Sequence, residues 1–336
     1  MNKTPAVRFI GFAEDWEQRK LGEVGKTYSG LSGKTKDDFG HGEAKFVTYM
    51  NVFSNSVCLP NMTETVEIDN KQNKVLFGDV LFTTSSETPE EVGMSSVWLE
   101  NAENIYLNSF CFGYRPTKEF NPYYLAYMLR SPSIREKITF LAQGISRYNI
   151  SKNKMMDIEI PIPSIVEQKQ IGEHFRTLDS LITLHQRKYE KLKNIKKSML
   201  YKMFPKNGSN VPEIRFKGFT DAWEQRKLNE ITDVRDGTHD SPKYVQEGHP
   251  FITSKNVSNG FINYDDVQYV TDEDYEKINK RSKVDVHDIL MGMIGTIGNL
   301  ALIRKKPDFA IKNVALIKYT GDIEYNYLYQ ALQADC

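Results

Sequence analysis

The stretch "DDFGHGEAK" holds the acidic and basic residues that most resemble a catalytic constellation. Asp37 and Asp38 precede Glu43 and Lys45, an order that superficially matches the Asp…Glu-x-Lys site of nucleases. Such triplets are also common in charged loops, where they have no catalytic role. We interpret the stretch as a charged loop. An autonomous nuclease is the alternative, and it requires Mg²⁺-dependent cleavage by the isolated chain.

A second stretch, "NPYY" (Asn121–Tyr124), resembles the Asn-Pro-Pro-aromatic signature of amino-group DNA methyltransferases, but Tyr123 replaces the second proline. No glycine-rich cofactor motif precedes it, and the sequence has no P-loop. "NPYY" is instead typical of a helix start, with Asn121 as the cap and Pro122 at the first helical position. "GMIGTIG" (Gly292–Gly298) is not a GxGxxG fingerprint, so we interpret it as backbone that packs closely against a strand.

The cysteine and histidine residues do not form a metal-binding pattern. The 3 cysteines have no short spacing, so neither a disulfide framework nor a zinc site is indicated. The 6 histidines form no HxxxH or HExxH pair. We therefore predict that the chain binds no metal or cofactor and catalyses no reaction by itself.

Several loop segments carry the side chains that hydrogen-bond to base edges and phosphates, namely serine, threonine, asparagine, lysine and arginine. The same residue types also build ordinary turns, and each position taken alone favours that interpretation. As groups of loops on two repeated scaffolds, they predict contact with DNA. The candidate DNA-binding residues are Ser29, Lys34, Lys36, Thr48, Asn51, Thr83, Thr84, Ser85, Ser146, Arg147, Asn149, Arg235, Thr238, His239, Ser241, Lys243, Tyr244, Ser254, Lys255 and Asn256.

Charge is balanced over the whole chain but not along it. Lys+Arg and Asp+Glu both total 44, so only local charge argues for a nucleic-acid partner. Positive charge is concentrated between Arg187 and Lys206, where Glu190 is the single acid. This basic stretch fits a phosphate backbone and a solvated helix face equally well.

The elements that must position these residues occur twice. "VRFIGFAEDWEQRKLGEV" (7–24) and "IRFKGFTDAWEQRKLNEI" (214–231) align without a gap, at an offset of 214 − 7 = 207 residues. Weaker likeness follows in the same order: "FVTYMNV" with "FITSKNV", "VLFGDVLF" with "VDVHDILM", and "YLAYML" with "YLYQAL". The matching segments keep their order while the sequences between them differ. This pattern predicts two domains of one architecture that recognise different targets. Phe9, Phe12 and Trp16 are expected to anchor the start of the unit in its core; ligand contact by Trp16 or Trp223 is the alternative.

Within a unit, short runs rich in β-branched and aromatic residues predict strands over 45–52, 74–85, 95–100 and 110–116. Gly78-Asp79 and Gly113 are expected at turns or bulges. "NPYYLAYMLRS" predicts a helix with Tyr124, Leu125, Met128 and Leu129 on one face. The predicted fold class is α+β, with two repeated mixed α/β domains.

A long helix is predicted between the two copies. Ser164, with Glu167 three residues later, forms a capping box that starts a helix from about Ile165 to Phe204. Its apolar residues follow a four-three spacing over five heptads, which predicts a coiled-coil seam; one helix lying on a globular core is the alternative. The seam consists of Ile171, Phe175, Leu178, Ile182, Tyr189, Leu192, Met199 and Met203, interrupted by His185 and Lys196.

Length and composition bound the domain organisation and the location. At roughly 100–200 residues per domain, a chain of 336 residues is expected to form two domains. We place a first recognition domain at 1–160, the long helix at 161–206 as a spacer and dimerisation element, and a second recognition domain at 207–336. No stretch approaches the ~20 apolar residues of a membrane span, and no signal peptide is evident. The chain is therefore expected to be cytoplasmic, with no membrane partner.

Four motifs together carry a family resemblance over essentially the whole chain. The opening "F…GF…WEQRKL", "DGTHDSPKY", "IPIPSIVEQKQI" and "KKSMLYKMFP" resemble the specificity subunit of type I restriction–modification enzymes. The resemblance implies two target recognition domains that each read half of a split site in double-stranded DNA, and long helices that hold them apart. It implies that methyltransferase subunits flip out and methylate an adenine in each half-site using S-adenosylmethionine. It also implies that a restriction subunit, a motor-nuclease with ATP and Mg²⁺, cuts unmodified DNA.

The sequence departs from this family pattern at one place. In the family, a second helix follows the second recognition domain and packs antiparallel on the first. Here the counterpart of about 134–206, including that of "GISRYN", is missing from the second copy, so we expect a C-terminally truncated chain or a seam that pairs with another molecule. Self-association through the helix at 165–204 would satisfy the second expectation. The competing hypotheses are a coiled-coil scaffold that binds no DNA and an inactive truncated product.

Overall fold

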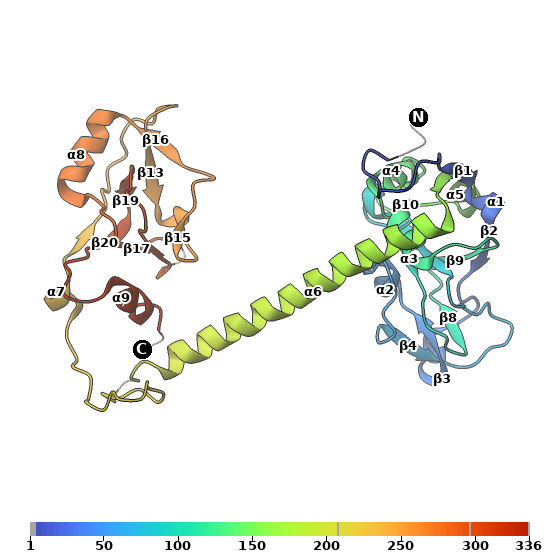
Figure 1. Cartoon of the computed structure of the whole chain (residues 1–336), viewed down its shortest axis with the longest axis horizontal. Helices are drawn as coiled ribbons and strands as arrows, with labels where there is room; N and C mark the ends of the chain where they lie inside the picture. Colours follow the sequence, from blue (N-terminus) through green and yellow to red (C-terminus); the bar gives the residue numbers. More distant parts are fainter. Residues whose placement is uncertain (1–4, 207, 296, 335–336) are drawn as a thin grey trace. The chain divides into compact units, whose positions relative to one another are not determined.

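The computed structural model describes residues 5–206, 208–295 and 297–334. The chain divides into two compact units, unit 1 (Met1–Gln186) and unit 2 (Arg187–Cys336), and the division falls inside helix α6 (Ile165–Lys202). Each unit mixes helices and strands (Figure 1), which confirms the predicted α+β class. Within the described ranges, no helix combines the length and the apolar composition that a membrane crossing needs.

Unit 1 alternates short strands with short helices before α6 begins. Its strands are β1 (Glu17–Lys20), β2 (Gly25–Ser29), β3 (Phe39–Val47), β4 (Thr63–Val66), β5 (Val80–Thr83), β6 (Ser85–Ser86), β7 (Ser95–Val97), β8 (Ile105–Leu107), β9 (Cys111–Pro116), β10 (Tyr148–Asn149) and β11 (Glu159–Ile162). Its helices before α6 are α1 (Leu21–Val24), α2 (Tyr49–Ser54), α3 (Pro122–Met128), α4 (Pro132–Phe140) and α5 (Lys152–Met156).

Two sheets form the centre of unit 1, one in the order β2-β9-β5-β7 and one in the order β4-β3-β8. Buried side chains of the first sheet, including Phe82 and Phe112 stacked at 5.2 Å, build the core. Gly78, at a φ of +84°, lies in a turn, as predicted. Gly113 instead lies inside β9, where a Cβ would come within 1.9 Å of the Tyr28 ring. The prediction of a turn or bulge at Gly113 is therefore wrong, and close approach of a neighbouring ring is the reason for the glycine.

The predicted strand over 45–52 is wrong beyond Val47, where β3 ends and helix α2 follows. Thr48 caps α2, because its Oγ1 accepts a hydrogen bond from the Asn51 amide at 3.2 Å. The side chain of Asn51 then donates to the Leu59 carbonyl at 2.8 Å. These local hydrogen bonds override the β propensity of the segment. The predicted helix after Asn121 is confirmed. The Asn121 side chain caps it by accepting a hydrogen bond from the Tyr124 amide at 3.0 Å.

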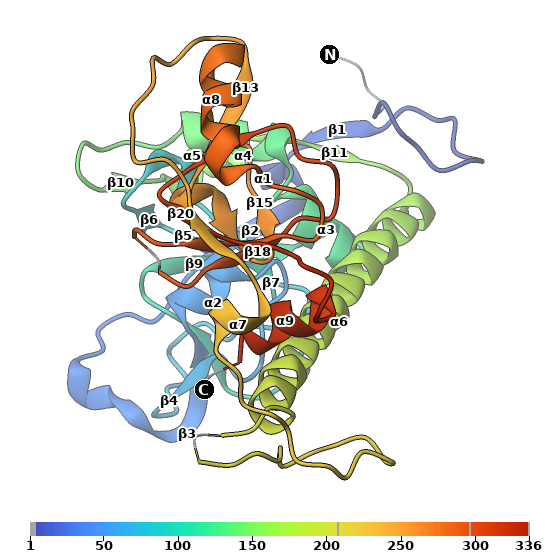
Figure 2. The same ribbon diagram turned by 90° about the vertical axis from the view of Figure 1, so that its left-hand side faces the viewer.

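Unit 2 contains the end of α6 and a second set of elements. Its strands are β12 (Val234–Asp236), β13 (His249–Thr253), β14 (Val257–Ser258), β15 (Phe261–Ile262), β16 (Gln268–Val270), β17 (Ile289–Gly292), β18 (Leu300–Leu302), β19 (Ala310–Lys312) and β20 (Val314–Ile317). Its further helices are α7 (Leu228–Ile231), α8 (Asp272–Ser282) and α9 (Tyr325–Ala331). Ile278 of α8 packs with Phe251 of β13 and Ala310 of β19, and α8 lies next to β13 in both Figures 1 and 2.

The two units share one sheet topology. The order β12-β20-β17-β18 repeats β2-β9-β5-β7, and the order β16-β13-β19 repeats β4-β3-β8. In both smaller sheets the central strand runs parallel to one neighbour. A matched glycine follows the first strand of each large sheet: a Cβ on Gly30 would lie 2.2 Å from the Asn108 carbonyl oxygen, and one on Gly237 would lie 2.9 Å from that of Ile311. The repeated sequence therefore encodes a repeated fold.

Each unit also buries an aspartate at the matched position. Asp79 accepts hydrogen bonds from Arg115 at 2.7 and 2.8 Å and from the Tyr28 hydroxyl at 2.7 Å. Burial, and then the negative charge of Asp79, raise the pKa of Tyr28. In unit 2, Asp288 accepts from Lys318 at 2.6 Å. Both units thus pair a buried carboxylate with a cation from the neighbouring strand region, which keeps the charge compensated.

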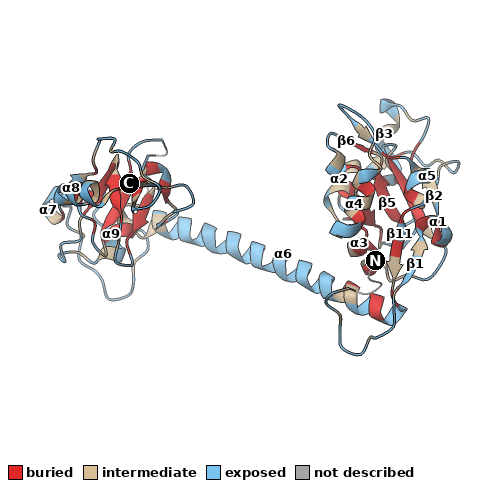
Figure 3. Cartoon of the chain, turned by 90° about the horizontal axis from the view of Figure 1, so that it is seen from above, coloured by how far each residue is buried: buried red, intermediate tan, exposed pale blue. Residues whose placement is uncertain are grey.

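Helix α6 begins at the predicted place and ends two residues before the predicted Phe204. Ser164 caps it, since its Oγ accepts from the Glu167 amide at 3.4 Å. The predicted capping box is wrong in its second half. Among the described residues, the Glu167 carboxylate accepts from Arg8 at 2.7 and 2.8 Å and from the Trp16 indole at 3.1 Å. Figure 3 shows that the first turns of α6 are partly buried, whereas its middle is exposed.

The repeated opening phrase of unit 1 lies against the start of α6. Trp16 is half-buried there, and Phe9 meets the His174 ring edge-to-face at 5.7 Å. The prediction that Phe9 and Trp16 anchor the unit in its core is therefore wrong. Their partner is a helix that begins more than a hundred residues later, and we call this contact of Arg8 and Trp16 with Glu167 the clasp.

Candidate nucleic-acid interface

Two loops of unit 1 that were predicted separately as DNA contacts lie together. Strand β6 pairs with β10, so that Ser85 is opposite Asn149. Arg147 donates to the Ser85 hydroxyl at 3.1 and 3.3 Å, and its guanidinium lies 5.8 Å from the centre of the Phe110 ring. The Tyr49 hydroxyl donates to the Ser85 carbonyl at 2.7 Å, which fixes this strand from the other side.

The exposed side of this cluster can bind a base edge or a phosphate. Arg147, Ser146 and Asn149 are exposed, and so is the Phe110 ring. Ser85 engages the Nε and Nη2 of Arg147, so Nη1 remains as a directed donor with no partner among the described residues. Phe110 was not among the predicted residues. The sequence places Phe110 only in a predicted strand. That position does not distinguish an exposed phenylalanine from one in the core.

A second group of predicted residues in unit 1 lies around Ser29. Lys152, which was not predicted, donates to the Ser29 hydroxyl at 2.9 Å. Lys34 forms an ion pair with Asp69 at 3.0 Å, whereas Lys36 is exposed. The Lys71 amide and then Lys34 lower the pKa of Asp69 to about 2. The charge of Lys34 is thus compensated by Asp69. The exposed ammonium of Lys36 is the freer of the two to bind a phosphate.

Some predicted residues are too buried for direct contact with a duplex. Asn51 and Thr83 are fully buried, and the hydroxyl of Thr83 accepts from the Met94 amide at 3.0 Å. Thr48 caps α2, and the hydroxyl of Thr84 donates to the Phe110 carbonyl at 2.8 Å. Direct readout by Asn51 and Thr83 is therefore ruled out in this conformation, because their polar groups are used to fix the backbone.

The predicted residues of unit 2 gather around a turn after β19. The ring nitrogen Nδ1 of His239 is 2.7 Å from the Asn313 side-chain oxygen. The Lys312 ammonium donates to the Ser241 hydroxyl at 2.6 Å, and the Ser254 hydroxyl donates to the Asn313 carbonyl at 2.6 Å. Lys312 and Asn313 were not predicted. The sequence could have indicated a turn here through the asparagine. Asn313 has a φ of +53°, a conformation that asparagine tolerates better than most residues.

The other predicted residues of unit 2 differ in how free they are. Lys243 and Tyr244 are exposed, and Thr238 is half-buried in the turn. Arg235 is paired with Asp233 at 2.6 Å, and Lys255 with Asp266 at 2.7 Å. Ser254 and Asn256 are buried, and Asn256 caps its own turn by accepting from the Thr253 amide at 3.0 Å. Burial argues against direct contact of Ser254 and Asn256 with a duplex, and their hydrogen bonds fix the backbone of the turn instead.

One of the residues considered for catalysis, Asp38, has a structural role. Asp38 accepts from the amide and hydroxyl of Thr35 at 2.6 and 2.9 Å and so caps a short turn. Across the described ranges, no three His, Cys, Asp or Glu residues are grouped as metal ligands. The expectation that the glycines of "GMIGTIG" pack closely against a strand is wrong for Gly295 and Gly298. Both have positive φ, and no atom lies within 4 Å of a built Cβ, so they serve a turn.

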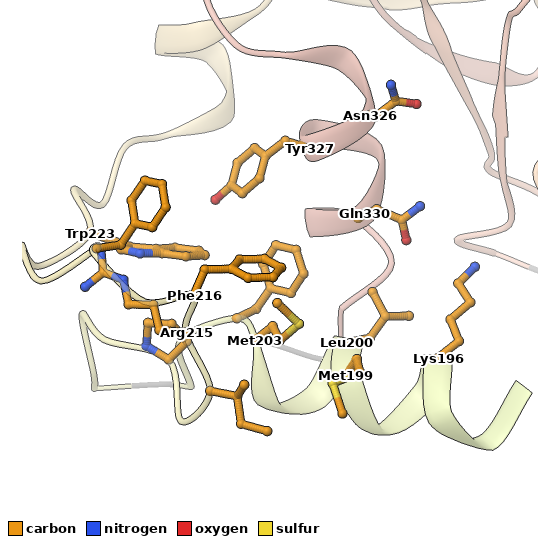
Figure 4. Close-up of a pocket in the computed structure, with 14 residues that line it drawn as sticks. Lys196, Met199, Leu200, Met203, Arg215, Phe216, Trp223, Asn326, Tyr327 and Gln330 are labelled. Carbon is orange, nitrogen blue, oxygen red and sulfur yellow. The ribbon is translucent and has the colours of Figure 1, made fainter. Parts of the chain in front are cut away.

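The predicted seam of α6 is largely exposed. Leu178, Ile182, Tyr189 and Leu192 are all exposed, whereas Ile171 packs on the core of unit 1. Phe175 meets the Tyr127 ring at 5.3 Å. Met199 and Met203 line a groove in unit 2 that Arg215 also lines (Figure 4). A run of exposed leucine, isoleucine and tyrosine at this spacing is typical of a helix that packs on another helix.

A model of the "Type I restriction modification DNA specificity domain" matches residues 13–194. The chain therefore belongs to the family of type I restriction–modification specificity subunits, which are non-catalytic components of their complexes. It is 26% identical over 300 residues to a Methanocaldococcus jannaschii protein provisionally named the type I restriction enzyme MjaX specificity subunit, covering 85% of this chain and 68% of that protein. It is 25% identical over 243 residues to the EcoKI specificity subunit of Escherichia coli K12, covering 70% of this chain and 52% of that protein. The chain thus spans between about half and two-thirds of the length of these relatives.

The fold agrees with a solved structure of this family. The crystal structure of a type I restriction–modification S subunit from M. genitalium superposes with a TM-score of 0.54 at 15% identity, covering 97% of this chain and 78% of that one. At this identity the likeness concerns the fold alone. It extends the match beyond residue 194 to both units.

Proposed function

We propose that this chain reads a bipartite double-stranded DNA target for a type I restriction–modification complex, with one half-site read by each unit. The observation that carries the proposal is the pairing of one fold with two different polar clusters. Unit 1 presents Arg147 and Asn149 beside β6, and unit 2 presents His239 and Lys312 beside the turn at Asn313. A common frame with divergent polar loops suits two readers of different sequences.

The proposed division of labour follows the predicted domains. Residues 1–160 and 207–336 act as recognition domains, and residues 161–206 act as spacer and dimerisation helix. The exposed seam at Leu178, Ile182 and Leu192 supports self-association through this helix. If it holds, the fragment 7–206 is a half-specificity unit that forms dimers and directs methylation of a palindromic site. A fragment that stays monomeric and never supports methylation contradicts this part of the proposal.

The chemistry is assigned to partners. Methyltransferase subunits with S-adenosylmethionine would methylate an adenine in each half-site, and restriction subunits with ATP and Mg²⁺ would cut unmodified DNA. The specificity chain contributes only the choice of sequence, and it would act in the cytoplasm with the DNA. Family membership and the clusters of exposed polar residues support this assignment.

The test is methylome sequencing of a host that carries the chain with its methyltransferase partner. We expect methylation at one bipartite motif. Arg147→Ala is expected to relax or abolish one half of the motif, and His239→Ala the other half, because each side chain belongs to one unit. Lys118→Ala and Lys280→Ala, at exposed lysines outside the clusters, serve as controls and should leave the motif unchanged. Methylation that does not depend on the chain, or both halves relaxed by one substitution, would reject the proposal.

A further inference from the structure

Arg130, in the turn between α3 and α4, closes the end of helix α2. Its Nη2 donates to carbonyls that the last turn of α2 leaves free, and its Nε donates to a carbonyl of β7; the acceptors are Val52, Phe53 and Asn55 at 2.8–2.9 Å and Ser95 at 2.6 Å. A cation is favourable at this end of a helix because of the helix dipole. Among the described residues no carboxylate pairs with Arg130, and burial, followed by the charge of Arg135, lowers its pKa to about 10. Arg130 therefore stays charged at neutral pH, and its hydrogen bonds go to backbone carbonyls.

Arg135, in helix α4, holds the loop that follows β6 in the same way. Its Nη1 donates to the Gly93 carbonyl at 2.7 Å, and its Nη2 donates to the carbonyls of Glu90 and Val92 at 2.8 and 2.6 Å. Gly93 has a φ of +64°, and a Cβ there would lie 2.8 Å from the Ile138 side chain, so the loop also packs tightly on α4. A lysine could not reproduce this contact, because its donors share one nitrogen whereas the arginine fork reaches the carbonyls from two.

The two held segments both contact β6, the strand beside the polar cluster of unit 1. Tyr49 in α2 donates its hydroxyl to the Ser85 carbonyl at 2.7 Å. Glu91 in the loop after β6 accepts from the Ser86 hydroxyl at 3.1 Å. β6 in turn pairs with β10, and the Ser85 hydroxyl accepts from Arg147. Each of the two arginines is therefore linked, through the segment that it holds, to the strand that orients Arg147, although neither donates to the exposed cluster itself.

We propose that Arg130 and Arg135 are positioning residues for base recognition: they hold β6, and through it the guanidinium of Arg147, in the orientation that selects a base. The inference rests on the proposed function, in which unit 1 reads one half-site. A hydrogen bond to a base edge weakens steeply when donor and acceptor are misaligned, so selection needs a guanidinium whose plane is fixed. The hydrogen bonds of the two arginines to backbone carbonyls fix the segments that hold β6, one through α2 and one through the loop after β6.

The test measures discrimination by the assembled complex, as the ratio of its affinities for the cognate duplex and for a duplex altered in one half-site. Arg135→Lys keeps the charge but loses the fork, so we expect the ratio to fall by about tenfold at the half-site that Arg147→Ala relaxes and to stay unchanged at the other. Arg130→Lys should act in the same direction. In an Arg147→Ala background, Arg135→Lys should alter the ratio by less than about twofold, because its effect passes through Arg147. Tyr49→Phe, which removes only the hydroxyl bonded to β6, should lower the same ratio by about threefold.

The ratio separates positioning from stability. A purely structural role would reduce the amount of active complex, and thus binding to all duplexes alike, without moving the ratio. Glu136→Gln, at an exposed residue of α4 next to Arg135, is the matched control and should leave the ratio unchanged. An unmoved ratio for both Arg135→Lys and Tyr49→Phe, while Arg147→Ala still relaxes one half-site, overturns this inference alone, and so does full additivity of Arg135→Lys with Arg147→Ala. If Arg147→Ala relaxes neither half-site, the proposed function and this inference fail together.

Discussion

Arg8 and Arg215 occupy the same position in two copies of one phrase, yet their surroundings differ. Arg8 closes on a buried carboxylate at 2.7 Å, whereas two nitrogens of Arg215 are buried beside an open groove with no acceptor among the described residues. In unit 1 the phrase therefore binds a helix start and does not act as a core anchor. Where α6 begins, this contact is formed and the first unit is closed around it.

The same comparison separates what each unit needs for its own stability. Both copies bury an aspartate that pairs with a cation, and both form the same two sheets. Among the residues that the structure describes, only the first copy also has a closed clasp. The sheets and the aspartate are therefore common to both units, while the clasp of unit 1 depends on Glu167 at the start of α6.

The largest expected effect concerns the feature that the units share. Asp79→Ala removes the acceptor of Arg115, Tyr28 and the Leu76 amide, so unit 1 should lose about 4 kcal/mol. Asp288→Ala should cost unit 2 about 3 kcal/mol, because Lys318 keeps its second carboxylate partner, Asp285. Hydrogen exchange resolved by mass spectrometry assigns each loss to its unit. A loss of stability in the unsubstituted unit would show that the two units are not stabilised independently of each other.

The next effect concerns the clasp, where the units differ. Arg8→Ala should destabilise unit 1 by about 2–3 kcal/mol, because it leaves the buried Glu167 unpaired. Arg215→Ala should leave unit 2 as stable as before or more stable, because it removes two buried nitrogens that have no acceptor among the described residues. Urea unfolding followed by unit-resolved hydrogen exchange compares the pair. Equal losses for the two variants would mean that Arg215 already has an acceptor, and the contrast would fail.

Much of the architecture was accessible to sequence reasoning because it depends on local chemistry. The repeat, the α+β class, the Asn121 cap and the long helix all followed from phrases, caps and periodicity. The errors arose where distant residues decide the outcome. The clasp joins Arg8 to Glu167 across 159 positions, and the strand predicted at 45–52 yielded to hydrogen bonds of Asn51 with Leu59.

The candidate interface divides in the same way. Residue types selected loops whose side chains lie together in the structure, including those of Arg147 and His239, but they did not select the residues that complete these clusters. The pairing of β6 with β10 brings Arg147 to Ser85 across 62 positions, and Ser254 donates to the Asn313 carbonyl across 59 positions. Burial, which excludes Asn51 and Asn256 from direct contact, depends on tertiary packing that polar composition does not reveal.

A smaller effect is expected at the two polar clusters. In the assembled complex, Arg147→Ala should weaken binding of the cognate target by about tenfold, within the ~1–3 kcal/mol of a base-contacting arginine. Lys312→Ala in unit 2 should weaken binding by about twofold to threefold on all sequences and reduce the salt dependence, as expected for a phosphate contact. Titrations of cognate and scrambled duplexes at several salt concentrations distinguish the two. A loss for Arg147→Ala that is equal on both duplexes would reassign that residue to the phosphates.

The smallest effect concerns acid sensitivity, which the two aspartate sites should not share. Asp285 of unit 2 corresponds to Leu76 of unit 1, and its hydrogen bond from Lys318 lowers its pKa. Because the pKa is lower in the folded state than the ~3.9 of an unfolded aspartate, the stabilisation is present above about pH 4 and is lost as the pH falls through the folded pKa. Asp285→Asn should therefore flatten the acid limb of unit 2 and leave that of unit 1 unchanged. The change should be below about 1 kcal/mol, since the carboxylate is half-exposed and screened. Unit-resolved unfolding between pH 2 and pH 6 measures it, and an unaltered acid limb of unit 2 would place its acid sensitivity on other carboxylates.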